Sequence, residues 1–183
     1  MILSGIRVKT ALLLRHAKSA WGTPGLEDHD RPLNDRGQQA ARRIADYIAH
    51  NGPRPDLILC STSVRTRQTL AALVSRLPAP APPIALEKGL YLASEMALLA
   101  RLRAVPDETE TVLLIGHNEG IWQLAELLAG HGPASLLSAL RDKYPTGALA
   151  VLRAPTARWA DLAAGSAELR AFVRPRDLRP ADA

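Results

Sequence analysis

The sequence predicts an α/β fold in which a largely parallel sheet is covered by helices on both faces. Short apolar runs of strand length alternate with longer segments of helical periodicity, and the connections between them are short. After its first residue the run DLILC at 56–60 has no polar alternation, which is typical of a strand buried on both faces. Without an internal repeat or domain boundary, residues 1–183 are expected to form a single domain with a core at about 11–174 and flexible ends.

The expected elements alternate along the chain. They are a strand at 10–14, a helix from 34 to 52, a strand at 56–60, a helix at 63–77, a short strand at 84–86 after the proline-rich segment 79–83, a helix at 94–105, a strand at 111–116, a helix at 119–130, strands at 147–153 and 168–174, and a frayed tail at 174–183. Asn34 and Ser94 are the expected helix N-caps, because their side-chain oxygens can accept from a backbone N–H of the first turn. The sequence NG at 51–52 is the expected end of the first helix.

The composition is typical of a globular protein and favours acidic partners. Hydrophobic residues make up 47% of the chain and charged residues 22%. The formal net charge of +5 suits phosphate groups and other acidic ligands. The basic residues are scattered rather than gathered in a basic arm, so we expect no nucleic-acid partner. No segment approaches the ~18–20 apolar residues of a membrane span, so we expect no membrane partner either.

The single cysteine and the N terminus predict a cytoplasmic protein. Cys60 has no second cysteine with which to form a disulfide within the chain, and it stands in an apolar run. This placement predicts a buried thiol in a reducing compartment. Charged residues interrupt the apolar residues of the N terminus, which differs from the apolar stretch of a signal peptide.

Polar side chains follow three of the predicted strands, at the points where the strands end. They are Arg15 and His16 after the first strand, Ser61, Arg65 and Arg67 after the second, and His117 and Asn118 after the strand at 111–116. Because ligands of open α/β sheets bind at the carboxyl ends of the strands, we expect these side chains to converge. Arginine binds phosphate oxygens with its planar fork, and helix N-termini add amide donors. The pattern therefore predicts a site for a phosphoryl group, with Arg67 exposed to solvent.

A metal site is the main competing use of the histidines, and the sequence does not favour it. The chain has no HxxxH or HxH pair and no pair of cysteines. The remaining histidines, His29, His50 and His131, stand in polar loops or at a helix end. We therefore expect no metal ion.

Four segments carry a resemblance to a known family. LLLRHAKSAW, DHDRPLNDRG, STSVRTRQT and IGHNEG, in this order and spacing, resemble the histidine phosphatase superfamily, and most of all its SixA-type phosphohistidine phosphatases. The similarity spans about residues 11–174. It implies a phosphoglycerate mutase-like fold, a three-layer α/β/α sandwich with a mostly parallel central sheet. It also implies that His16 is the nucleophile, that Arg15 and Arg65 bind phosphate, and that His117 is the second active-site histidine.

The chemistry of these residue types agrees with the mechanism that the resemblance implies. A neutral imidazole is a competent nucleophile near neutral pH, because its unperturbed pKa is about 6.5. Arg15, Arg65 and a protonated His117 would neutralise the phosphoryl oxygens. Ser19 and Asn118 are candidate neutral donors to the same group. Water would then hydrolyse a phosphohistidine intermediate, so the expected mechanism needs no cofactor.

The general acid is the point at which the sequence departs from larger members of this family. Those proteins place a glutamate shortly after the third strand, whereas EKGLYLASE has Leu92 at that position. Asp28, Asp30 and Glu87 remain as candidate proton donors. An alkyl ester needs protonation of its leaving alkoxide, whereas phosphohistidine can leave as neutral imidazole. The missing glutamate therefore favours a substrate with a P–N bond.

The function predicted from the sequence is removal of phosphate from phosphohistidine on a partner protein. Short connections after the strands predict an open site that admits such a partner. The alternative enzyme is a general phosphatase of small phosphomonoesters or phosphoproteins, for which Glu87 or Asp30 would act as the acid. The alternatives outside enzymes are a non-catalytic phosphate-binding module and a basic nucleic-acid binder. The sequence does not specify the oligomeric state.

Overall fold

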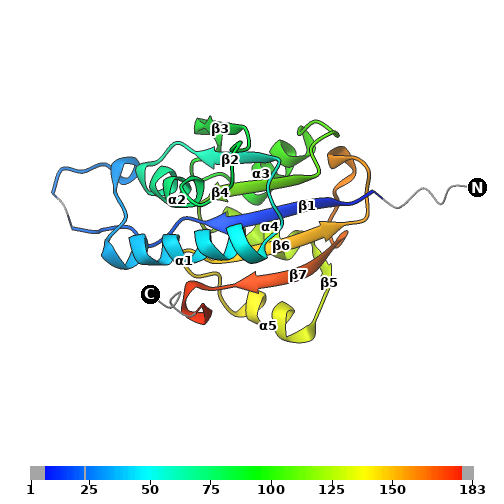
Figure 1. The fold of residues 1–183 in the computed structure, drawn as a ribbon. Helices are drawn as coiled ribbons and strands as arrows, with labels where there is room; N and C mark the ends of the chain where they lie inside the picture. Colours follow the sequence, from blue (N-terminus) through cyan, green and yellow to red (C-terminus); the bar gives the residue numbers. More distant parts are fainter. Residues whose placement is uncertain (1–6, 23, 179–183) are drawn as a thin grey trace, which may run out of the picture.

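A mixed sheet of seven strands organises the computed structural model, which describes residues 7–22 and 24–178 (Figure 1). The strand order is β3-β2-β4-β1-β6-β7-β5. The strands are β1 Lys9–Arg15, β2 Leu57–Ser61, β3 Ile84–Glu87, β4 Thr111–Gly116, β5 Ala129–His131, β6 Leu149–Ala154 and β7 Ala167–Val173. β6 runs antiparallel to both of its neighbours, and the other neighbouring pairs are parallel. The predicted α/β class with a mostly parallel sheet is therefore confirmed.

Helices cover both faces of this sheet. They are α1 Asp35–Asn51, α2 Val64–Val74, α3 Glu95–Arg103, α4 Gly120–Leu128 and α5 Ala134–Asp142, with the short 3-10 helices η1 Asp28–Asp30, η2 Lys88–Leu90, η3 Trp159–Asp161 and η4 Pro175–Asp177. α1 and α2 lie on the near face in Figure 1, and α3, α4 and α5 pack on the other. Leu12 and Leu14 of β1 face α1 and α2, whereas Ala11 and Leu13 face the opposite helices. The three-layer sandwich is confirmed.

The two predicted helix caps are confirmed, and one of them fixes the segment next to the site. The Asn34 side chain accepts a hydrogen bond from the Gly37 backbone N–H at 2.8 Å, and Ser94 caps α3 in the same way. Gly37 lies so close to Lys18 that a Cβ on it would come within 2.0 Å of the Lys18 carbonyl oxygen. The start of α1 is therefore packed directly on the chain that follows β1.

The prediction for residues after the fourth helix is wrong. The helix expected at 119–130 ends at Leu128, because the next residues pair with β7 as the short strand β5. Gly130 of β5 lies against Gly165, and a Cβ on Gly130 would come within 1.9 Å of the Gly165 carbonyl oxygen. α5, which then leads back toward the site, has no counterpart among the predicted elements.

The predicted frayed tail is wrong for its first residues. η4 packs against α1, and the Arg174 side chain forms an ion pair with Asp177 at 2.6 Å. These contacts tie the chain down as far as residue 178. Of the flexible ends expected on either side of about 11–174, residues 1–6 and 179–183 lie outside the described residues, and Lys9 and Thr10 belong to β1.

Two observations bear on the predicted compartment. Cys60 is fully buried, as predicted, and burial raises the pKa of its thiol to about 12. Within residues 7–22 and 24–178, no helix is both long enough and apolar enough to span a membrane. The cytoplasmic location itself stays a prediction.

Candidate active site

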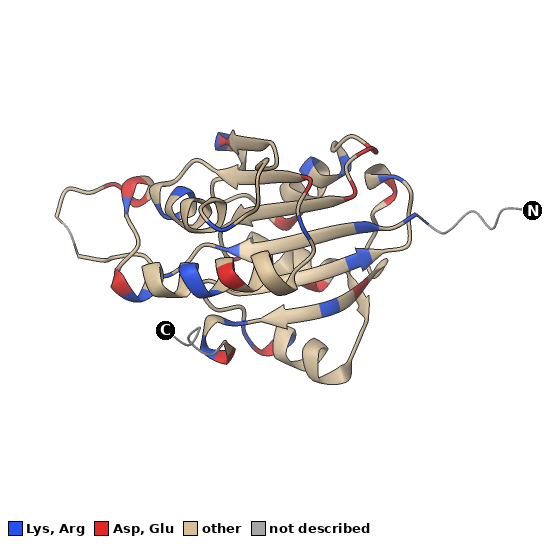
Figure 2. Ribbon diagram, viewed as in Figure 1, with Lys and Arg blue, Asp and Glu red and all other residues tan. Residues whose placement is uncertain are grey.

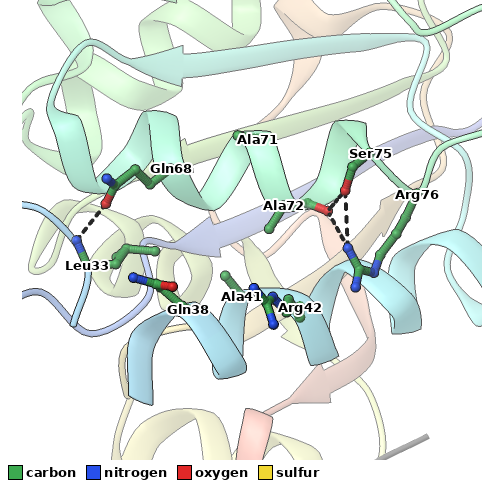
Figure 3. Close-up of a pocket in the computed structure, with 9 residues that line it drawn as sticks. All are labelled: Leu33, Gln38, Ala41, Arg42, Gln68, Ala71, Ala72, Ser75 and Arg76. Carbon is green, nitrogen blue, oxygen red and sulfur yellow. Dashed lines mark hydrogen bonds between the residues drawn. The ribbon is translucent and has the colours of Figure 1, made fainter. Parts of the chain in front are cut away.

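A cavity of about 570 Å³ lies at the carboxyl ends of β1 and β4 and the start of α2. Of the residues singled out in the sequence, it is lined by Arg15, His16, Ser19, Asp28, Arg65, His117 and Asn118. A separate hollow of about 490 Å³ lies between α1 and α2 (Figure 3). Its lining residues are nonpolar, amide, hydroxyl and arginine side chains, and none of them is a candidate site residue. We therefore take the cavity at the strand ends as the candidate active site.

His16 follows β1 directly and is only 8% exposed. Its backbone N–H donates to the Gly116 carbonyl of β4 at 3.0 Å, so the neighbouring strand holds it in place. The ring Nδ1 lies 2.7 Å from the Ala17 carbonyl oxygen, which can only accept, so Nδ1 carries the proton. Nε2 therefore holds the lone pair, and it accepts from Arg65 Nε at 3.3 Å. Burial, with a smaller contribution from nearby arginines, lowers the pKa of His16 to about 4, so the ring is neutral at pH 7.

His117 faces His16 across the site, with 5.2 Å between the ring centroids. Its Nδ1 accepts from Arg65 Nη2 at 3.3 Å, because guanidinium nitrogens only donate. Nε2 therefore carries the proton and donates to Ser61 Oγ at 2.8 Å. Burial is the main reason that the pKa of His117 is lowered to about 3. The nearby Asp28 carboxylate raises this pKa, but by less than burial lowers it. The His117 ring is therefore neutral in the site without a phosphoryl group, and the protonated ring expected beside bound phosphate stays a prediction.

Arg65, in the first turn of α2, connects the two histidines to an acidic partner. It is 3% exposed, and besides its bonds to the rings its Nη2 donates to Asp28 Oδ2 at 2.9 Å. Its Nη1 donates to the Asp28 backbone carbonyl. A buried guanidinium needs such a partner, because an unpaired buried charge is strongly destabilising. Arg67 of the same helix is exposed, as predicted.

Arg15 presents a donor that the protein leaves without a partner. Its Nη1 donates to the Tyr144 carbonyl at 2.7 Å. Its Nε is buried and has no hydrogen-bond partner among the described residues, and the same holds for Oδ1 of Asn118. Burial lowers the pKa of Arg15 below its ordinary value. Because an unsatisfied buried polar atom lowers stability, Arg15 Nε stands as a donor suited to an anion.

Arg31 and Tyr91 belong to the site although the sequence analysis gave them no role. Arg31 donates to Asp28 Oδ1 at 2.7 Å and to Ser19 Oγ at 2.6 Å, and its guanidinium carbon lies 3.3 Å from the centroid of the Trp21 ring. The Tyr91 hydroxyl donates to Asp28 Oδ2 at 2.6 Å. The only sequence signal for Arg31 is its place in the DHDRPLNDRG segment, and Tyr91 stands next to Leu92.

Asp28 lines the cavity but is poorly placed to serve as an acid. The hydrogen bond from Tyr91 is the main reason that the pKa of Asp28 is lowered to about 2, and Arg65 and Arg31 also contribute to this lowering. The carboxylate is therefore ionised at neutral pH and has no proton to give. Leu92, at the position where the sequence analysis expected a glutamate, lines the cavity.

The other two candidate acids are wrong, because each is held away from the cavity. Asp30 is exposed and lies 3.0 Å from His29 Nδ1. Glu87 ends the edge strand β3, where Arg101 of α3 binds its carboxylate at 2.7 Å. Neither residue lines the cavity. Over the described residues, no group of three or more His, Cys, Asp or Glu side chains is placed to hold a metal ion.

The prediction of short connections is wrong between β1 and α1. The described residues there, 16–22 and 24–34, project beyond the end of the sheet to which β1 points (Figure 1). Its residues Ser19, Trp21, Asp28 and Arg31 contribute to the lining of the cavity. One side of the candidate active site is therefore built by a long loop rather than by the strand ends alone.

Comparison with known proteins decides the family. The family described as the histidine phosphatase superfamily (branch 1) matches residues 11–91. An uncharacterised protein of Mycobacterium tuberculosis is 38% identical over 165 residues, which cover 89% of this chain and 100% of that relative. A solved structure of a candidate phosphohistidine phosphatase SixA from Nakamurella multipartitia is 32% identical, has a TM-score of 0.80, and covers 92% of this chain and 96% of that chain. The chain belongs to the histidine phosphatase superfamily.

A second structure of a histidine phosphatase supports the SixA-type resemblance. A candidate phosphohistidine phosphatase SixA from Agrobacterium tumefaciens is 36% identical, with a TM-score of 0.77. The match covers 91% of this chain and 98% of that chain. The family resemblance inferred from the four sequence segments is confirmed. The reaction and substrate of this superfamily member depend on the chemistry of its own cavity.

Proposed function

We propose that this histidine phosphatase removes phosphate from phosphohistidine on a partner protein, with His16 as the nucleophile. The observation that carries the proposal is the tautomer of His16. Its Nδ1 proton is held by the Ala17 carbonyl, which leaves the Nε2 lone pair in a cavity lined by Arg15 and Arg65. This is the arrangement that nucleophilic attack on a phosphoryl group requires.

The proposed reaction has two steps at the same nitrogen. In the first, His16 Nε2 forms a bond to phosphorus while the bond between phosphorus and the substrate imidazole breaks. The substrate ring, protonated on its other nitrogen, keeps the electron pair of that bond and leaves as neutral imidazole. In the second step water attacks phosphorus and the pair of the N–P bond returns to Nε2. The water loses its proton to solvent, and inorganic phosphate leaves.

The surrounding cations fit the charge of the transferring group. The partnerless Nε of Arg15 supplies one donor to the phosphoryl oxygens. Arg65 would exchange its two long bonds to the histidine rings, each 3.3 Å, for shorter bonds to these oxygens. A phosphoryl dianion beside His117 would also raise the pKa of that ring, which allows a charged hydrogen bond once substrate is bound.

The lack of a poised acid supports a P–N substrate. Leu92 occupies the expected position of the acid, and the Asp28 carboxylate is kept ionised by its partners. An imidazole leaving group needs no further proton, whereas an alkoxide does. We therefore expect phosphohistidine to be hydrolysed far faster than alkyl phosphate esters.

The test compares kcat/KM for a phosphohistidine peptide, an aryl phosphate and an alkyl phosphate on the same enzyme preparation. The proposal predicts the order phosphohistidine, then aryl, then alkyl, with alkyl phosphate at least about a hundredfold slower, since general acid catalysis contributes about 10²–10⁴-fold. Equal turnover of the alkyl ester would contradict it and would favour the general phosphomonoesterase. Binding of phosphate without turnover of any substrate would favour the non-catalytic module.

A further inference from the structure

We infer that an acidic segment of the phosphorylated protein docks in a second, basic pocket beside the active-site cavity. This inference rests on the proposed function. The basic pocket has a volume of about 300 Å³, and its charged lining residues are Lys18, Arg36, Asp142, Lys143, Arg174 and Arg176. Neither the proposed mechanism nor the family motifs give it a role.

The basic pocket is continuous with the active-site cavity. Lys18, Lys143, Pro145 and Thr146 line both. The two hollows therefore share one border, made by the chain after β1 and the chain after α5. A protein that presents a phosphorylated side chain to His16 must place neighbouring parts of its own chain over this border.

The charge of the basic pocket is strongly one-sided. Five of its lining residues are cations and one, Asp142, is an anion. Lys18, Arg36 and Lys143 are exposed and form no ion pair with any described residue. Figure 2 shows basic residues on both α1 and the short C-terminal helix η4 beside it. Arg174 and Arg176 at η4 share Asp177 as an ion-pair partner. The cations without an ion pair among the described residues, on α1 and on the chain after β1 and after α5, make a surface that attracts carboxylates.

The two pockets divide the recognition of one substrate between them. In the cavity, half-buried Arg15 and buried Arg65 bind the phosphoryl group itself. In the basic pocket, exposed cations bind side chains near the phosphorylated histidine, and their effect is on encounter and therefore on kcat/KM. Exposed charges are screened by salt, so the preference for acidic partners should weaken as ionic strength rises.

The test uses two peptides that differ only in whether the residues around phosphohistidine are Glu or Gln, with phosphoimidazole as a small substrate. The double variant Arg36→Glu/Arg176→Glu reverses two exposed charges of the basic pocket. Arg42→Glu is the matched control, because Arg42 is exposed on the same helix but lines the hollow between α1 and α2 (Figure 3). Asp142→Asn removes the one carboxylate of the pocket.

The wild type should hydrolyse the Glu peptide about tenfold faster than the Gln peptide in kcat/KM at low salt, which corresponds to about 1.4 kcal/mol. The double variant should lose this preference, Asp142→Asn should increase it, and Arg42→Glu should keep it. The kcat/KM for phosphoimidazole should stay within about twofold of the wild-type value in all three variants, because this substrate is too small to contact the exposed side chains of the basic pocket.

Four results would overturn the inference. Equal turnover of both peptides by an active wild type overturns the docking while leaving the proposed function intact. If Arg42→Glu lost the preference for the Glu peptide as fully as the double variant does, the preference would come from the overall charge of the protein rather than from the basic pocket. A kcat/KM that is higher for a small bisphosphate than for the Glu peptide would assign the basic pocket to a small-molecule substrate. If the wild type hydrolyses neither peptide nor phosphoimidazole, the proposed function fails and the docking fails with it.

Discussion

Two basic side chains stand at opposite ends of β1, and the protein treats them differently. Lys9, at the start of the strand, is 2% exposed, and its Nζ donates to the carbonyls of Asp107 and Thr109. Arg15, at the end of the strand, donates to the Tyr144 carbonyl but leaves its buried Nε without a partner among the described residues. The first cation is satisfied by the fold, and the second faces a cavity.

This difference separates stability from function along a single strand. The Lys9 ammonium donates to two backbone carbonyls, and these hydrogen bonds hold the loop that contains Asp107 and Thr109 against the sheet instead of binding a ligand. A charge with an unmet donor lowers stability unless a ligand supplies the acceptor. The carboxyl end of the sheet therefore carries the chemistry, as expected for open α/β sheets.

Replacing Arg15 should give the largest effect. Arg15→Ala should lower kcat/KM for a phosphohistidine peptide by about 10²–10³, since one donor to a charged transition state contributes about that much. The free energy of unfolding should change by less than about 1 kcal/mol, because a single hydrogen bond is lost. Peptide turnover and urea unfolding measure the two effects, and an unchanged kcat/KM would place Arg15 outside the site.

Replacing Lys9 should have the opposite profile. Lys9→Met keeps the length of the side chain but leaves two carbonyls without a donor, so the free energy of unfolding should fall by about 1–3 kcal/mol. The kcat/KM of the folded enzyme should not change, because the substitution lies at the other end of β1. A loss of kcat/KM at unchanged stability would break the comparison.

The pH dependence of stability should come from the carboxyl end of the sheet. The pKa values of His16 and His117 are lowered from 6.5 to about 4 and about 3, mainly by burial. Below pH 6.5 the unfolded chain binds protons that the folded site does not, so the free energy of unfolding falls as the pH drops toward 4. His117→Asn should reduce the loss between pH 7 and pH 5 by about 1–2 kcal/mol. Lys9→Met should leave this pH dependence unchanged. If the free energy of unfolding of His117→Asn fell between pH 7 and pH 5 as much as that of the wild type, burial of a neutral His117 would not be the cause.

The two helix caps provide the smallest contrast. Asn34→Ala and Ser94→Ala should each lower the free energy of unfolding by about 1 kcal/mol. Only Asn34 also donates to the Ser19 carbonyl, at 3.3 Å, next to the cavity. Asn34→Ala should therefore lower kcat/KM as well, whereas Ser94→Ala should not. Equal kcat/KM values for the two variants would show that the start of α1 does not position the site.

The parts of the fold that could be predicted are those determined by local pattern. The buried strands β1 and β4 are continuous apolar runs, and the caps at Asn34 and Ser94 are single residue types at helix starts. β5 could not be predicted, because its three residues follow α4 without a break and pair only with β7. Strand pairing between distant segments leaves no mark in so short a run.

The same distinction applies to the site. Arg15, His16 and His117 could be placed together because each stands at the carboxyl end of a strand or directly after it, and β1 and β4 are parallel neighbours. The contact of Tyr91 with Asp28 joins residues 63 positions apart, and it depends on how the segment 16–34 folds back over α2. The lowered pKa of Asp28, which moves this carboxyl further from serving as a proton donor, follows from that long-range contact rather than from any motif.

The most direct test of the account is to trap the phosphoenzyme. Enzyme mixed with a ³²P-labelled phosphohistidine peptide is quenched in alkali, where phosphohistidine survives, and half of each sample is then acidified. We expect ³²P label on the wild-type enzyme in alkali and loss of this label on acidification. We expect no label on His16→Ala. Arg67→Ala, an exposed substitution two residues from Arg65, serves as the control and should retain the label. No label on an active wild type, or the same label on His16→Ala, would contradict the claim that Nε2 of His16 attacks phosphorus.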